Sequence, residues 1–502
     1  MKVSGLGRFA LGQSVPNREH AVCVSLPTVR DLVGYEEKDN RVRSSIRSGY
    51  PRFVQHYRIG ELIRFLDLKE GTEGRRRFLF ADAQTCKEAG EVFSITDATI
   101  EETEEFTSLL IPDGSPNIDF IASFLQHSGS GISSRMAEDI LLRAGQLEHR
   151  ETISQVESPG DTIRNIIAKA HGPEISREDV LLGSSGANVF YSLFRSACEH
   201  SRGKGKDLWI RMGWLYLDTI EVMDLLTNED ERVIPLNRLE DFARIEELFK
   251  EHGERIAGVV TEFPTNPLLQ ACDLEKVKEL CAKTNSLLIA DPTMASPKNA
   301  KVSGLADVVV NSLTKYAGCE GDVMMGSLVF PKKSSLGREL LEQTTDRICP
   351  PFERDLLRMA EQIQQYDNFI ETTNRSLIKI VDFLESHEKV GAVHWAYQSA
   401  NQGAFGKLAG DDHPGCVASF ELKGSFEAFY DRLEMLKSPS FGTQFSLCCP
   451  YVYLAHYKLM KSENGLNTLA EAGLSPELLR LSVGMEDPDQ ITEALKDALA
   501  AT

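Results

Sequence analysis

The sequence predicts an α/β fold with a large domain on a mostly parallel sheet and a smaller C-terminal α/β domain. The first observation is a series of continuous apolar runs separated by helical stretches, at residues 180–182, 256–260, 287–290 and 308–310. Such runs are typical of strands that helices cover on both faces. The second is a stretch from Phe352 to about Ser386 without glycine or proline, which predicts a helix that bridges the two domains.

The expected elements begin and end at recognisable residues. Asp273 can cap a helix that runs to Ala282 with one apolar face. In the smaller domain, residues 417–422 and 479–483 are expected strands. Asp487 caps a final helix with a proline in its first turn. The expected segments are an N-terminal extension and inter-subunit segment at residues 1–150, a large domain at residues 151–372 and a small domain at residues 373–502. The first 130 or so residues are expected to be irregular and polar.

The amino-acid composition and net charge limit the kinds of molecule that the protein is expected to bind. Hydrophobic residues make up 42% and charged residues 26% of the 502 residues, as in ordinary globular proteins. The formal charge of -20 disfavours nucleic acid and anionic membranes as partners. The sequence has no membrane-length apolar stretch, no apolar core of a signal peptide and no cysteine spacing typical of a metal site. We expect a cytoplasmic protein without a metal, with reduced and mostly buried cysteines.

Chemically useful residues follow three of the expected strands. Residues 183–188, Gly-Ser-Ser-Gly-Ala-Asn, open a helix whose free N–H groups suit a phosphate. Asp291 follows the strand at 287–290, and Lys315 follows the strand at 308–310. Each has an ordinary alternative, because such turns, capping aspartates and snorkelling lysines are common.

Taken together, these residues indicate a cofactor. Ligands of open α/β sheets bind at the carboxyl ends of the strands, where Asp291 and Lys315 can reach one pocket. Pyridoxal phosphate needs an amine, a carboxylate at its ring nitrogen and a phosphate cradle. The sequence supplies all three and predicts pyridoxal 5'-phosphate on Lys315.

These motifs resemble the Cys/Met-metabolism group of fold-type I pyridoxal-phosphate enzymes. The resemblance covers the chain from about Gly131 onward and rests on residues 262–267, 291–293, 312–315 and 479–486. Earlier segments resemble the fungal cystathionine γ-synthase branch, at residues 20–28, 34–37 and 49–53.

The resemblance implies a role for each matching residue. Lys315 would hold the cofactor as a Schiff base and shuttle protons between substrate carbons once released. Asp291 would pair with the ring nitrogen, Tyr216 would stack on the ring, and Asn266 would lie near the ring oxygen. The remaining cofactor-binding residues would hold the phosphate; they are Ser185, Gly186, Ala187, Ser312, Thr314 and, from a neighbouring subunit, Arg135. From sequence alone, Tyr216 is as easily a core aromatic.

The predicted substrate is an amino acid. Arg480 would clamp its α-carboxylate through a bidentate guanidinium, assisted by Ser440. The alternation of Leu479, Arg480 and Leu481 leaves one polar face, although an exposed strand arginine is an alternative.

The resemblance favours γ-replacement on an O-acyl-L-homoserine by cysteine or another nucleophile. A carbon nucleophile in specialised metabolism, a β- or γ-lyase and a catalytically dead partner subunit are the alternatives. The chain departs from the family pattern at Ala187, Ser133 and Pro292, which leaves the nucleophile open. A homodimer or homotetramer with shared active sites is expected.

Overall fold

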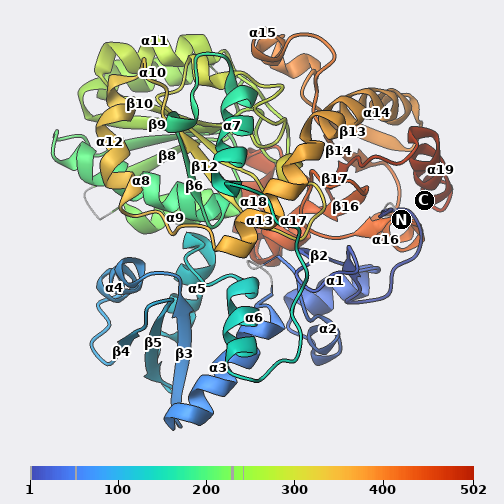
Figure 1. The fold of residues 1–502 in the computed structure, drawn as a ribbon. Helices are drawn as coiled ribbons and strands as arrows, with labels where there is room; N and C mark the ends of the chain where they lie inside the picture. The colour runs from blue at the N-terminus through green and yellow to red at the C-terminus, as the bar shows by residue number, and fades with distance from the viewer. Residues whose placement is uncertain (1–2, 51–53, 228–230, 241) are drawn as a thin grey trace.

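The structure is a computed structural model that describes residues 3–50, 54–227, 231–240 and 242–502. Figure 1 shows a large α/β domain, a smaller domain that contains both chain termini, and a third unit of three strands and flanking helices below them. No helix within the described ranges is long and apolar enough to cross a membrane. All ten cysteines are free and buried, which confirms their predicted burial.

A seven-stranded sheet forms the centre of the large domain, in the order β6-β12-β11-β10-β9-β7-β8. Pairings are parallel from β11 to β8, and β12 is antiparallel to both of its neighbours. The strands are β6 (Val180–Gly183), β7 (Leu208–Met212), β8 (Arg232–Leu236), β9 (Ile256–Glu262), β10 (Leu287–Asp291), β11 (Val308–Ser312) and β12 (Gly326–Val329). The predicted mostly parallel sheet is therefore confirmed.

Helices lie on both faces of this sheet (Figure 1). They are α7 (Pro159–His171), α8 (Gly186–Arg202), α9 (Leu217–Leu226), α10 (Phe242–His252), α11 (Leu274–Thr284) and α12 (Ser335–Thr345). Asp273 caps α11 by accepting a hydrogen bond from the N–H of Lys276, as predicted. The apolar runs are buried between these helices, with Val259, Leu288 and Val309 all 0% exposed.

The predicted bridge is nearly continuous. It consists of α13 (Glu353–Gln362), a short 3-10 helix (Ile363–Gln365) and α14 (Tyr366–Ser386). A five-stranded sheet follows in the order β13-β14-β17-β16-β15. Its strands are β13 (Val390–His394), β14 (Val417–Leu422), β15 (Leu436–Lys437), β16 (Leu447–Pro450) and β17 (Leu479–Ser482). Its helices are α15 (Ala404–Ala409), α16 (Phe426–Arg432), α17 (Tyr451–Ala455), α18 (Glu463–Glu471) and α19 (Pro488–Leu499), the last capped by Asp487 as predicted.

The prediction of an irregular N-terminal region is wrong. Its first part joins the small domain, because Leu26, Leu32 and Val42 are buried in the core that also holds Phe420 and Leu481. Its elements are β1 (Ser14–Val15), β2 (Cys23–Val24), α1 (Val29–Glu36) and α2 (Asn40–Ser45).

The rest of the N-terminal region forms an antiparallel sheet in the order β3-β5-β4, with helices packed on it. The elements are α3 (Tyr57–Glu70), β3 (Arg75–Phe80), α4 (Ala83–Val92), β4 (Thr99–Glu102), β5 (Thr107–Pro112), α5 (Ile118–Ser128) and α6 (Ser134–Arg143). These strands were not predicted because β3 begins with consecutive arginines and β4 is mostly exposed, so neither shows the alternation of apolar and polar residues that predicts a strand.

Candidate active site

The predicted catalytic and substrate-binding residues meet in one cavity between the two domains. This cavity has a volume of about 40 Å³, and Lys315, Tyr216, Asn266, Ser440 and Arg480 line it together with Tyr50. Lys315 and Asn266 follow strands of the large sheet, whereas Arg480 lies on β17 of the small one. We call this space the substrate cavity.

Lys315 lines the substrate cavity, three residues after β11 ends at Ser312. Its side chain is nearly buried, at 7% exposure. Nζ lies 3.4 Å from Oη of Tyr50, 4.4 Å from the centre of that ring and 5.4 Å from the centre of the Phe441 ring. The amine is therefore enclosed by aromatic side chains and does not snorkel to solvent.

Asp291 ends β10 and pairs in register with Glu262 at the end of β9. One Asp291 oxygen accepts hydrogen bonds from the N–H (2.8 Å) and the hydroxyl of Thr293. Burial raises the pKa of Asp291 to about 6. Burial and the nearby Asp291 charge raise the pKa of Glu262 well above its ordinary value. A cation at this point would stabilise the ionised carboxylate, which is the chemistry that a protonated pyridine nitrogen offers.

Tyr216 precedes α9 and is held by the end of β9. Its N–H donates a hydrogen bond to Glu262 Oε1 at 2.6 Å. Glu262 therefore links the Asp291 strand end to the loop that carries Tyr216, a role that no sequence motif indicated beyond the match at residues 262–267.

The turn before α8 has the features of an anion cradle. Ser185 caps α8 by accepting a hydrogen bond from the Asn188 N–H at 3.0 Å. Gly186 lies so close to the end of β11 that a Cβ there would be 2.8 Å from the Ser312 Cβ. Ser312 Oγ is buried and has no hydrogen-bond partner among the described residues. Open N–H groups at a helix N-terminus, next to an orphaned hydroxyl, fit a phosphate group.

Two other residues predicted to bind the phosphate, Ala187 and Thr314, have surroundings that differ from those of Gly186 and Ser312. Ala187 lines a second, larger cavity of about 780 Å³ together with Ser184 and Ser185. We call it the phosphate-side cavity. Thr314 Oγ1 accepts a hydrogen bond from the Met325 N–H at 3.1 Å, so its hydroxyl connects the Lys315 loop to the segment before β12.

Arg480 is placed to bind a carboxylate. It is 5% exposed, Nη1 donates to Asn266 Oδ1 at 2.7 Å, and Nη2 donates to the Ser440 carbonyl oxygen at 2.9 Å. Its guanidinium lies near the rings of Phe441 and Tyr451. Arg480 Nε and Ser440 Oγ are buried and make no hydrogen bond within the described parts of the chain. The alternative of an exposed strand arginine is excluded.

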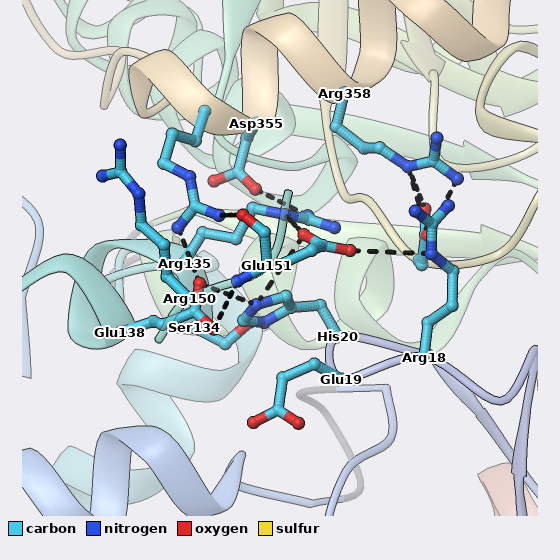
Figure 2. A network of polar contacts seen from close by, with 12 residues as sticks. Arg18, Glu19, His20, Ser134, Arg135, Glu138, Arg150, Glu151, Asp355 and Arg358 are labelled. Carbon is cyan, nitrogen blue, oxygen red and sulfur yellow. Dashed lines mark hydrogen bonds and ion pairs between the residues drawn. The ribbon is translucent and has the colours of Figure 1, made fainter. Parts of the chain in front are cut away.

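Arg135 lies in a buried network of ion pairs (Figure 2). It is 1% exposed, Nε contacts Glu151 Oε2 at 2.7 Å, and Nη1 contacts Asp355 Oδ1 at 3.0 Å. Arg135 and Ser185 both line the phosphate-side cavity. Ser133, where the family pattern has an aromatic residue, caps α6 by accepting from the Met136 N–H.

This network joins three parts of the chain that the sequence alone cannot bring together. Arg18 and His20 come from the N-terminal segment, Glu138 comes from α6, and Arg358 comes from α13 (Figure 2). His20 donates to or accepts from Ser134 Oγ at 2.8 Å and lies 3.4 Å from Glu138. The network therefore fixes the N-terminal segment against the large domain.

The fold and the site together define a pyridoxal-phosphate-dependent enzyme of fold-type I. The family model for Cys/Met metabolism PLP-dependent enzymes matches residues 178–500. The chain belongs to this family, and its cofactor is pyridoxal 5'-phosphate.

Two known proteins match almost the whole chain, and a solved structure matches most of it. An L-2-amino-4-chloropent-4-enoate dechlorinase/desaturase from Streptantibioticus cattleyicolor is 32% identical and covers 98% of both chains. Cystathionine gamma-synthase from Neurospora crassa is 26% identical, also over 98% of both chains. The structure of cystathionine gamma-lyase from yeast has a TM-score of 0.58 at 23% identity, over 72% of this chain and 94% of that one. The likeness to that structure supports the predicted fold.

Proposed function

We propose that this enzyme acts on an L-amino acid with a leaving group on Cγ, and that O-acyl-L-homoserine is its first candidate substrate. The observation that carries the proposal is the convergence of Lys315, Asn266 and Arg480 on one enclosed cavity. An amine and a carboxylate-binding guanidinium in one small space suit an α-amino acid beside the cofactor.

Each residue has a role in this proposal. Arg480 binds the α-carboxylate through its guanidinium and excludes water from that end of the substrate cavity. Lys315 would hold the cofactor, and its Nζ would move protons from Cα and Cβ of the substrate. Pyridoxal phosphate supplies the electron withdrawal that acidifies these carbons. Asp291 would keep the proton on the ring nitrogen, and Tyr216 would lie against the ring.

The phosphate is proposed to bind at the turn of Ser185, Gly186 and Ala187, together with Ser312 and Thr314. Arg135 is proposed to reach the phosphate of a neighbouring subunit through the phosphate-side cavity, in a homodimer or homotetramer. Mixing Arg135→Ala protein with Lys315→Ala protein should then restore part of the activity, because a mixed dimer contains one intact site. A fully active monomer in light scattering would contradict this assembly.

Two reactions share this chemistry up to the loss of the γ leaving group. The similarity to cystathionine gamma-synthase supports capture by a nucleophile, such as cysteine. The similarity to a dechlorinase/desaturase supports a second candidate, loss of chloride from Cγ without replacement, because the chlorine in that relative's named substrate is on C4.

A substrate panel separates these reactions. Purified enzyme receives O-acetyl-L-homoserine or L-2-amino-4-chloropent-4-enoate, each alone and with cysteine, sulfide or a carbon acid. Cystathionine is supplied alone in a separate reaction, and all products are identified by mass spectrometry. For γ-replacement we expect slow release of 2-oxobutanoate from O-acetyl-L-homoserine alone, and sharp suppression once the right nucleophile is added. Loss of chloride from L-2-amino-4-chloropent-4-enoate, with none of the added nucleophiles incorporated into the product, would favour the second candidate. Efficient cleavage of cystathionine with no replacement product would make the enzyme a lyase.

A further inference from the structure

Tyr50 brings the N-terminal segment into contact with the reacting amine. Its hydroxyl oxygen accepts a hydrogen bond from Lys315 Nζ at 3.4 Å, and Nζ lies 4.4 Å from the ring centre. Tyr50 lines both the substrate cavity and the phosphate-side cavity. Tyr50 therefore lies where the substrate cavity and the phosphate-side cavity adjoin, and its hydroxyl contacts Lys315 Nζ.

Several contacts fix the position of Tyr50. The Ser48 and Ser14 hydroxyls lie 2.8 Å apart, which ties the loop before Tyr50 to β1. The Tyr50 carbonyl oxygen accepts a hydrogen bond from the Val54 N–H at 3.0 Å. The ring packs against the apolar cluster that contains Val22 and Phe445.

The strand pair that supports Tyr50 is itself attached to both domains. The Val22 N–H donates to the Gly321 carbonyl oxygen at 2.8 Å, in the loop that follows Lys315. The Val24 N–H donates to Ser438 Oγ at 3.0 Å, two residues before Ser440. Tyr50 is therefore held in place relative to Lys315 and to the Arg480 side of the cavity at once.

We propose that Tyr50 is a further catalytic residue, which stabilises the ammonium form of Lys315 during proton transfer; this rests on the proposed function. The proton moves from a substrate carbon to Nζ and from Nζ to another carbon, and Tyr50 itself neither gains nor loses one. Its oxygen accepts a hydrogen bond from the ammonium group, and its ring face attracts the positive charge. Phe441 adds a second ring, at 5.4 Å from Nζ.

The test uses Tyr50→Phe, which keeps the ring and removes the hydroxyl. Tyr457→Phe is the matched control, because that hydroxyl lies on the small domain and contacts the exposed Glu37. Cofactor-free protein is labelled with acetic anhydride, and the Lys315 peptide is quantified by mass spectrometry. Without the hydroxyl, Nζ loses its hydrogen bond to Tyr50 Oη, so we expect labelling of Lys315 about fivefold faster, as for one lost hydrogen bond. Turnover of the loaded variant should fall by about 10-fold or more, as for one lost hydrogen bond to a charged group.

The possible failures are distinguishable. If the wild-type protein fails to link pyridoxal phosphate to Lys315, the proposed function fails and the role of Tyr50 fails with it. If wild type links the cofactor, yet Tyr50→Phe equals the control in both labelling and turnover, only the Tyr50 proposal is overturned. Mixing Tyr50→Phe with Lys315→Ala protein should not restore activity, because both residues belong to one chain's site. Restoration would assign the hydroxyl to the neighbouring subunit and overturn the contact within one chain.

Discussion

The active site has two sides, held by different kinds of interaction. On the strand-end side, Asp291 and Lys315 follow neighbouring parallel strands whose register fixes the backbone. On the N-terminal side, Tyr50 and Arg135 are held by side-chain hydrogen bonds and ion pairs between distant segments. Backbone pairing between neighbouring strands sets the positions of the cofactor-binding groups. The N-terminal side has a few backbone hydrogen bonds, such as that from the Val22 N–H to the Gly321 carbonyl oxygen, and otherwise depends on individual side chains. Single substitutions should therefore affect the two sides differently.

The largest expected effect is on the strand-end side. Lys315→Ala removes both the covalent attachment of the cofactor and the proton carrier, so turnover should fall by at least about 10⁴-fold. The fold should persist, because the loop is also held by Thr314 through Met325. Steady-state kinetics and circular dichroism test this, with the exposed Lys332→Ala as the control. Turnover within tenfold of wild type would remove Lys315 from the mechanism.

On the N-terminal side the expected loss is in stability. Arg135→Ala leaves the buried carboxylates of Glu151 and Asp355 with one cation fewer, so the free energy of unfolding should fall by about 3 kcal/mol. Arg150→Ala is the matched control, because that arginine is half-exposed and pairs with Asp139 at the edge of the same network. Its cost should stay below about 1 kcal/mol. If both substitutions lower the free energy of unfolding in urea by the same amount, burial does not distinguish Arg135 from Arg150.

Arg480→Ala tests the part of the site that the small domain contributes. Loss of the buried guanidinium should weaken binding of the amino acid by roughly 2–5 kcal/mol. The spectrum of the bound cofactor should persist, because the hydrogen bond that links Arg480 to a predicted cofactor-binding residue is to Asn266 and not to Lys315 or Asp291. Calorimetric titration measures the affinity, with the exposed Arg8→Ala as the control. Unchanged affinity would leave Arg480 with a structural role only.

The smallest expected effect is a pH dependence of the cofactor-free protein. The pKa of Asp291 is raised to about 6, above its value in the unfolded chain, so the native state holds its proton more tightly. Stability should therefore fall as pH rises from about 4 to about 6, where Asp291 ionises in its buried position. Asp291→Asn should flatten the pH dependence of the melting temperature in this window. A profile identical to wild type would show that Asp291 is not buried as described.

The same contrast explains which parts could be predicted from the sequence. The apolar runs at residues 256–260 and 308–310 predict buried parallel strands, and strand ends converge at one edge, so Asp291 and Lys315 could be paired without a structure. Tyr50 could not be assigned to this site from the sequence, because its loop has no apolar periodicity and its contact with Lys315 spans 265 residues. Glu262 was part of a recognised motif, yet its hydrogen bond to the Tyr216 N–H depends on how a loop folds back.

Borohydride reduction of the purified enzyme tests the central claim most directly. The reduction fixes the cofactor on the amine that holds it, and mass spectrometry of the digest identifies the labelled lysine. We predict a pyridoxyl group on the peptide that contains Lys315, and none in Lys315→Ala protein. Label on any other lysine of the wild-type protein would contradict the assignment of the active site.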